Sequence, residues 1–173
     1  MSVDDLRAKI REIPDFPKPG ILFYDITTLL KDHDGFRKAI DQMLAPYRDE
    51  RIDIVVGMES RGFIFSAPMA LELEAGFVPV RKLGKLPAET YSVEYALEYG
   101  SNTLEIHRDA ISAGQRVLIV DDLLATGGTV AGTIELVERL GGEVVGLAFL
   151  IELDFLKGRE RLPDRQVTSV IHY

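Results

Sequence analysis

The sequence predicts an α/β fold in which a twisted, mostly parallel sheet is flanked by helices. Three observations support this prediction. Short apolar runs rich in β-branched residues, such as "IDIVVGM" and "RVLIVDD", are typical of buried parallel strands. Segments with a helical period alternate with these runs, as in other α/β proteins. At 173 residues the chain has the length of one domain, and we expect residues 1–173 to form it.

The first half of the chain predicts a short helix, an extended segment and then alternating helices and strands. Residues 3–12 predict a short helix, stopped by Pro14 and the prolines that follow. "ILFYDIT" reads as an extended segment, and Asp34 can cap a helix that runs to about Leu44. Next come the strand "IDIVVGM", a helix over about residues 62–74 and the strand "GFVPVRK".

The second half holds the strongest strand candidates. "TLEIH" and "RVLIVDD" predict strands, "TVAGTIELVERLGG" predicts a helix, and "EVVGLAFLIEL" predicts a long final core strand. In open parallel sheets, ligands bind outside the carboxyl ends of the strands. "ESRG" and "DDLLATGGT" each follow a predicted strand, so we expect these two candidate sites to lie at the same edge of the sheet.

Composition excludes several classes of partner. The net charge of -8 argues against a general nucleic-acid or anionic-membrane surface, so an anionic ligand needs a local cluster of donors. The chain has no cysteine, which excludes disulfides and thiolate chemistry and suits a cytoplasmic protein. No apolar run is long enough to span a bilayer.

The stretch "VLIVDDLLATGGT" combines a strand, an acid pair and a glycine-rich turn before a helix. Backbone N–H groups of residues 126–129 and the positive end of the helix can bind an anion. Asp121 and Asp122 would repel a phosphate, so they suit ribose hydroxyls or a divalent cation carried by the ligand. A plain strand-to-helix turn with a capping aspartate is the alternative. Together, the acids and the loop describe a ribose 5-phosphate.

"VLIVDDLLATGGT" resembles the signature of the type I phosphoribosyltransferases, which bind phosphoribosyl pyrophosphate (PRPP). "IPDFPKPGILFYDIT", "GMESRGF", "RKLGKLP", "LEYG" and "LIELDFLKGRERL" resemble the adenine-specific branch of that family over nearly the full length. The resemblance implies transfer of the 5-phosphoribosyl group to N9 of adenine, giving AMP and pyrophosphate. It also implies Mg2+ carried by PRPP, a homodimer, an N-terminal hood segment and a mobile lid loop.

The resemblance also assigns site residues. Ribose and the 5-phosphate would be bound by Asp121, Asp122, Ala125, Thr126, Gly127, Gly128 and Thr129. Pyrophosphate would be bound by Glu59, Ser60, Arg61, Arg81, Lys82 and Lys85, with a cis peptide bond between Glu59 and Ser60. Adenine would be bound by Leu22, Phe23, Tyr24 and Leu153. Glu98 would handle the N9 proton, and Arg61 would be the second catalytic residue.

Some alternatives stay open at this level. The lid corresponds to residues 83–102, where tyrosines at 91, 95 and 99 would also suit a short amphipathic helix. For function, a non-catalytic sensor of PRPP or purines and a phosphoryl-transfer receiver domain are the competing hypotheses. A 6-oxopurine is the competing base. Retention of Glu98 and of the cations near the strand ends favours the enzyme.

Overall fold

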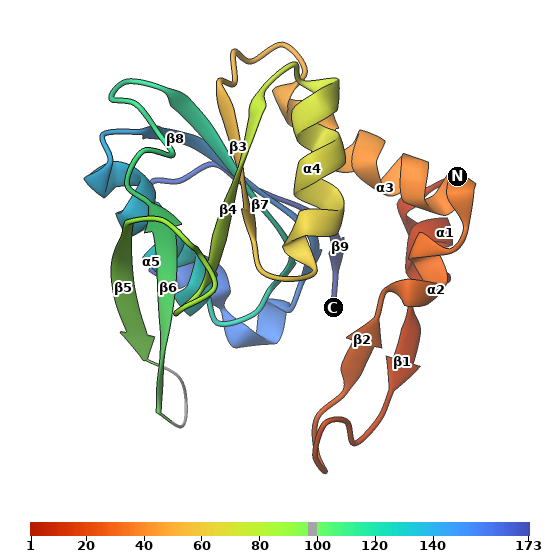
Figure 1. Ribbon diagram of the computed structural model, residues 1–173. Coiled ribbons are helices and arrows are strands. Elements are labelled where there is room, and N and C mark those ends of the chain that lie inside the picture. The colour runs from red at the N-terminus through yellow and green to blue at the C-terminus, as the bar shows by residue number, and fades with distance from the viewer. Residues whose placement is uncertain (97–99) are drawn as a thin grey trace. The chain divides into compact units, whose positions relative to one another are not determined.

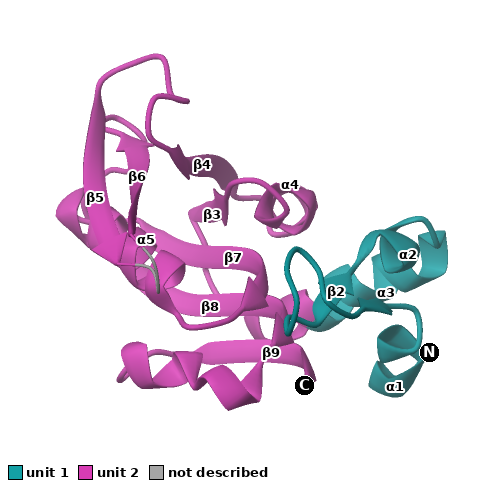
Figure 2. Ribbon diagram, turned by 90° about the horizontal axis from the view of Figure 1, so that it is seen from below, with its two compact units in different colours: residues 1–42 teal, residues 43–173 magenta. Residues whose placement is uncertain are grey.

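The computed structural model describes residues 1–96 and 100–173 (Figure 1). These residues form two compact units (Figure 2). One unit spans residues 1–42 and the other residues 43–173. The expectation of a single domain stays a prediction. No helix in the described part of the chain combines the length and the hydropathy that a membrane crossing needs.

The first unit is built from short helices and a two-stranded hairpin. It contains α1 (Val3–Arg7), β1 (Arg11–Ile13), β2 (Phe23–Asp25), α2 (Thr27–Leu30) and most of α3 (His33–Leu44). The predicted helix over residues 3–12 is therefore wrong beyond Arg7. There the chain leaves the helix because Arg11–Ile13 pairs antiparallel with Phe23–Asp25 and Arg11 forms an ion pair with Asp25.

The second unit is organised around a seven-stranded sheet in the order β5-β6-β4-β3-β7-β8-β9. Strands β4, β3, β7, β8 and β9 pair in parallel, whereas β6 pairs antiparallel with both β4 and β5. The strands are β3 (Ile54–Met58), β4 (Gly76–Lys82), β5 (Thr90–Ala96), β6 (Ser101–His107), β7 (Arg116–Leu124), β8 (Glu143–Glu152) and β9 (Val167–His172). The mostly parallel sheet of the predicted α/β class is confirmed.

Two long helices cover this sheet. Helix α4 (Gly62–Glu72) connects β3 to β4, and α5 (Gly128–Arg139) connects β7 to β8. These connections run in opposite directions across the sheet, so right-handed crossovers place the two helices on opposite faces (Figure 1). The short 3₁₀ helices η1 (Ala45–Tyr47), η2 (Asp154–Leu156) and η3 (Gly158–Arg161) complete the unit.

The core follows from the composition of the strands. Val117, Leu118, Ile119 and Val120 of β7 are all fully buried, as expected of a central parallel strand with a helix on each face. Such a strand has no solvent face, which explains why its apolar run is continuous rather than alternating. The carboxyl end of β7 is thereby fixed in place, together with the residues that follow it.

The sheet of the second unit contains two strands, β5 and β9, that the sequence did not predict. Residues 90–96 form β5 rather than a helix, because Tyr91, Val93 and Tyr95 alternate with exposed residues and pack towards α5. The helical alternative for this segment is wrong over its described residues. Strand β9 shows that β8 is not the last strand, since the polar "VTSVIH" forms an edge of the sheet.

Candidate active site

A cavity of about 390 Å3 lies where the order of the sheet reverses, at the carboxyl ends of β3 and β7. The connection after β3 leads to one side of the sheet and the connection after β7 leads to the other, which opens a crevice between them. Most of the predicted phosphate, ribose and pyrophosphate residues line this cavity: Glu59, Ser60, Arg61, Lys82, Asp121, Asp122, Ala125, Thr126, Gly127, Gly128 and Thr129. The predicted convergence of the two motifs is confirmed.

The acid pair lies near the carboxyl end of β7, and the strand continues through both residues to Leu124. Asp121 is half-buried, and its Oδ1 accepts a hydrogen bond from the backbone N–H of Asp122 at 2.8 Å. The first residue of α4, Gly62, lies close to the same oxygen. A Cβ on Gly62 would lie 2.7 Å from Asp121 Oδ1 and 3.2 Å from the carbonyl oxygen of Val120, so a larger residue there would displace the Asp121 carboxylate.

Arg61 connects the β3 side of the cavity to the acid pair. Its Nε lies 2.9 Å from Asp122 Oδ2 in an ion pair, and the Asp122 side chain is only 7% exposed. Asp122 Oδ2 accepts no hydrogen bond among the described residues, so this contact rests on charge. Burial raises the pKa of Asp121 well above its usual range, and the adjacent Asp122 raises it further, while Arg61 opposes this shift.

The glycine-rich turn begins α5. Gly127 has a left-handed backbone with φ of 83°, which favours glycine, and no side chain of the described residues caps the helix. The first backbone N–H groups of a helix have no partner within the helix. At this N-terminus they therefore remain available to an anion, as the sequence predicted. Thr129 Oγ1 lies 3.4 Å from the Tyr95 hydroxyl of β5.

The peptide bond between Glu59 and Ser60 is cis, as predicted. The Glu59 carboxylate accepts hydrogen bonds from the backbone N–H of Lys82 and from Arg81 Nη2, each at 2.9 Å. These two bonds lower the pKa of Glu59. Arg81 Nη1 also donates to the carbonyl of Lys85 at 3.2 Å. Arg81 and Lys85 are not among the lining residues, so their role in binding pyrophosphate stays a prediction.

The predicted adenine residues belong to different units. Leu22 is exposed, while Phe23 and Tyr24 lie on β2, where the Phe23 ring packs edge-on against Phe16 at 5.1 Å between centroids. Leu153 follows β8 and is buried, and its backbone N–H donates to the carbonyl of Leu124 at 3.0 Å. Their shared role in binding adenine stays a prediction. Glu98 lies outside the described residues.

Two polar residues of the cavity lining were not among the predicted site residues. Tyr95 on β5 and Asn102 on β6 are register partners across an antiparallel pair, and both line the cavity. The alternation of tyrosine and valine over residues 91–95 was the available signal, since a period of two predicts a half-buried strand. Nothing in the sequence distinguished Asn102 from an ordinary loop residue.

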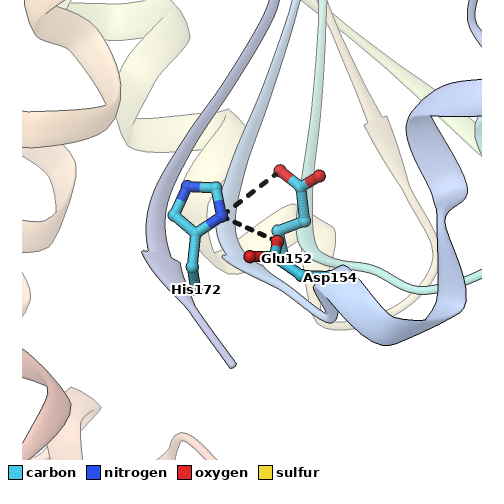
Figure 3. Close-up of side chains that lie close together, drawn as sticks. All are labelled: Glu152, Asp154 and His172. Atoms are coloured by element: carbon cyan, nitrogen blue, oxygen red, sulfur yellow. Dashed lines mark hydrogen bonds and ion pairs between the residues drawn. The ribbon is translucent and has the colours of Figure 1, made fainter.

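A second group of ionisable side chains lies at the end of β8, outside the cavity. Glu152, Asp154 and His172 come together there, with His172 Nδ1 at 2.8 Å from Asp154 Oδ1 and 3.9 Å from Glu152 Oε2 (Figure 3). Three ligands of this kind can hold a metal ion. The Glu152 carboxylate is already occupied, however, by Arg159 Nε and Nη2 at 2.7 Å each and by Ser169 Oγ at 2.6 Å. The buried Glu152 is therefore better described as the acid of an ion pair with Arg159 than as a metal ligand.

Comparisons with known proteins agree with this geometry. A family model described as a phosphoribosyl transferase domain matches residues 27–172. The adenine phosphoribosyltransferase of Acidobacterium capsulatum is 62% identical over 173 residues, covering 100% of this chain and 96% of the relative. The crystal structure of the adenine phosphoribosyltransferase from Rhodothermus marinus is 55% identical, with a TM-score of 0.95 and coverage of 99% and 98% of the two chains.

A third match is a structure with bound ligands. The Saccharomyces cerevisiae adenine phosphoribosyltransferase, complexed with an imino-altritol bisphosphate and adenine, is 44% identical with a TM-score of 0.92, covering 97% of each chain. The fold, the cavity at the reversal of the sheet and the family match define the class, and the chain belongs to the phosphoribosyltransferase family. Within that family, its full-length relatives place it among the adenine phosphoribosyltransferases.

Asp121→Asn is expected to stabilise the fold near neutral pH while impairing ligand binding. Because the pKa of Asp121 is raised in the folded state, its contribution to stability is lost as the pH rises through that pKa. A neutral amide avoids this loss, but it gives up a charged acceptor, which corresponds to about a 10- to 100-fold rise in KM for PRPP. Urea unfolding at several pH values and initial rates would check both effects. A variant less stable than the wild type at neutral pH would contradict the first.

Proposed function

We propose that this protein transfers the 5-phosphoribosyl group from PRPP to N9 of adenine, forming AMP and pyrophosphate. The observation that carries the proposal is the cavity in which an acid pair, a glycine-rich helix start and Arg61 meet. An open cavity of this composition suits a ligand with a phosphate at one end, hydroxyls in the middle and further phosphates at the other end. Its relatives with the same fold bear the name of this activity.

Different residues of the cavity bind different parts of PRPP. The backbone N–H groups at the start of α5, with Ala125, Thr126, Gly127, Gly128 and Thr129, bind the 5-phosphate. Asp121 and Asp122 accept hydrogen bonds from the ribose hydroxyls. On the β3 side, Ser60, Arg61 and Lys82 face the pyrophosphate, while Arg81 holds Glu59 in place. Electrostatic stabilisation of the departing pyrophosphate by these cations lowers the barrier.

The chemistry at the base needs one proton acceptor. The C1–pyrophosphate bond breaks as the C1–N9 bond forms, and Glu98 takes the N9 proton. Leu22, Phe23, Tyr24 and Leu153 bind adenine, and the yeast relative was solved with adenine bound. Mg2+ enters with PRPP as part of the substrate and neutralises phosphate charge. Lys85 adds positive charge near the pyrophosphate end.

The decisive experiment is AMP formation from PRPP and Mg2+ with adenine, hypoxanthine or guanine offered separately. Turnover with adenine alone is the expected result. Turnover with a 6-oxopurine would keep the reaction and overturn the base. Tight binding of PRPP without turnover of any base would favour the sensor instead. Activity unchanged by Glu98→Ala would remove Glu98 from its role as acid/base.

We also propose that the protein is a cytoplasmic homodimer without nucleic-acid or membrane partners. Apolar side chains on α4 and β4 support self-association: Leu71 is 81% exposed, and Ile64 and Phe77 are also exposed. Phe77 packs edge-on against Phe63, at 5.7 Å between ring centroids. Sedimentation equilibrium would test the dimer, and a monomer mass at assay concentration would contradict it.

A further inference from the structure

The connection between β8 and β9 packs directly against the glycine-rich turn. A Cβ on Gly127 would lie 2.6 Å from the carbonyl oxygen of Gly158, and a Cβ on Gly158 would lie 2.4 Å from that of Ala125. The two backbones therefore touch with no side chain between them. This contact fixes the position of η3, which begins at Gly158 and ends at Arg161.

The contact brings the side chain of Arg161 across both glycines of the turn. Its Cβ lies 3.4 Å from the position that a Cβ on Gly127 would occupy, and its Nη1 lies 3.3 Å from that of Gly128. Cδ2 of Tyr95, which lines the cavity, lies 3.4 Å from the same Gly128 position. The guanidinium thus lies beside the N-terminus of α5, next to Tyr95 in the wall of the cavity.

The side chain of Arg161 has no hydrogen bond or ion pair with any residue that the structure describes. The other arginines of this connection differ from it. Arg159 is paired with Glu152, and Arg165 is paired with Glu138 at 2.6 Å. A guanidinium carries five N–H donors in a planar fork that matches two phosphate oxygens. In Arg161 these donors lie beside the start of α5, and none of them has an acceptor among the described residues.

The charge of the cavity shows where such a cation is needed. The acidic and basic side chains of its described lining are three acids (Glu59, Asp121 and Asp122) and two cations (Arg61 and Lys82). Both cations follow β3 or belong to β4, and Arg61 is already paired with Asp122. At the α5 end the described lining supplies only backbone donors, hydroxyls and the helix dipole. A doubly charged phosphate at that end would lie close to two carboxylates without a cationic partner.

We propose that Arg161 is a further binding residue for the 5-phosphate of PRPP and AMP, contacting it from η3 across Gly127 and Gly128. The assignment rests on the proposed function, because that function places the 5-phosphate at the glycine-rich turn. Arg161 supplies the cation that the acidic lining lacks at this end. Gly128 leaves room for the guanidinium to approach the phosphate, since a Cβ at this position would lie 3.3 Å from Arg161 Nη1.

The test is calorimetric binding of AMP and of inorganic pyrophosphate to the wild type and to Arg161→Met, Arg161→Lys and Lys157→Met. Arg161→Met keeps the stem that packs on Gly127 and removes the charge. We expect it to raise the Kd for AMP about 3- to 20-fold, a range below that of a fully buried charged hydrogen bond because Arg161 is exposed. The Kd for pyrophosphate should not change. The Kd of Arg161→Lys for AMP should lie between those of the wild type and Arg161→Met, because an ammonium point charge replaces the planar guanidinium.

Lys157→Met is the matched control, because Lys157 lies in the same connection and its side chain is 71% exposed. It should bind AMP like the wild type. An unchanged Kd for AMP in Arg161→Met, or an equal loss in Lys157→Met, would overturn the proposal. Equal loss of AMP and pyrophosphate would overturn it as well. Binding requires no turnover, so a wild type that binds AMP but does not convert adenine would refute the proposed function alone.

Discussion

Replacing Arg61 by methionine is expected to lower kcat/KM for PRPP by about 100- to 1000-fold, the range for loss of one preorganised electrostatic contact to a developing charge. Arg61 is the cation that lies between the pyrophosphate side of the cavity and the acid pair. The same change should lower the free energy of unfolding by about 2 kcal/mol, because the buried Asp122 loses its partner. This is below the value for fully buried pairs, since the Arg61 side chain is 37% exposed.

A double variant separates the two effects. Adding Asp122→Asn to Arg61→Met removes the unpaired charge, so stability measured by urea unfolding should return while activity stays low. Arg51→Met is the control, because Arg51 forms an exposed pair with Asp53 just before β3, away from the carboxyl ends. Near-normal kcat/KM in Arg61→Met would refute its pyrophosphate role. A double variant as unstable as the single one would mean that the packing of the Arg61 stem matters more than its charge.

The predictable parts of the site are those whose residues stand together in one continuous sequence motif. The strand "RVLIVDD" and the helix start after it form an uninterrupted pattern of burial, charge and glycine, so sequence alone placed them at one strand end. The meeting of Asp122 with Arg61 follows from parallel topology, because the carboxyl ends of neighbouring parallel strands share an edge. Here local pattern and global fold point to the same arrangement.

The parts that were missed depend on contacts between distant segments. Strand β5 is a strand because it pairs with β6 and packs under α5, and its polar surface residues hide that environment in the sequence. Arg161 is exposed in a charged stretch, where a solvated side chain is the usual expectation. Only the backbone contact between Gly127 and Gly158 reveals its neighbour. Such contacts leave no periodic signal.

Arg159→Met is expected to destabilise the fold by about 2–3 kcal/mol near neutral pH, since it leaves the Glu152 carboxylate buried without a counter-ion. Glu152 is 5% exposed and Arg159 is 45% exposed, which reduces the cost below that of a fully buried pair. Because the pair supports the connection that touches the glycine-rich turn at Gly158, KM for PRPP should also rise. Arg165→Met, which breaks an exposed pair with Glu138, should change stability by no more than about 0.5 kcal/mol.

The pH dependence of this variant identifies the cause of its instability. Burial alone would raise the pKa of Glu152, but hydrogen bonds from Arg159 and Ser169 together lower it. A lowered carboxyl pKa contributes stability above the ordinary value, and this contribution is lost as the pH falls through the lowered pKa. The difference between wild type and Arg159→Met should therefore be full at about pH 7 and shrink towards about pH 3. A difference that stays constant over this range would assign the effect to packing of the arginine stem rather than to charge, because only the charge of Glu152 disappears on protonation.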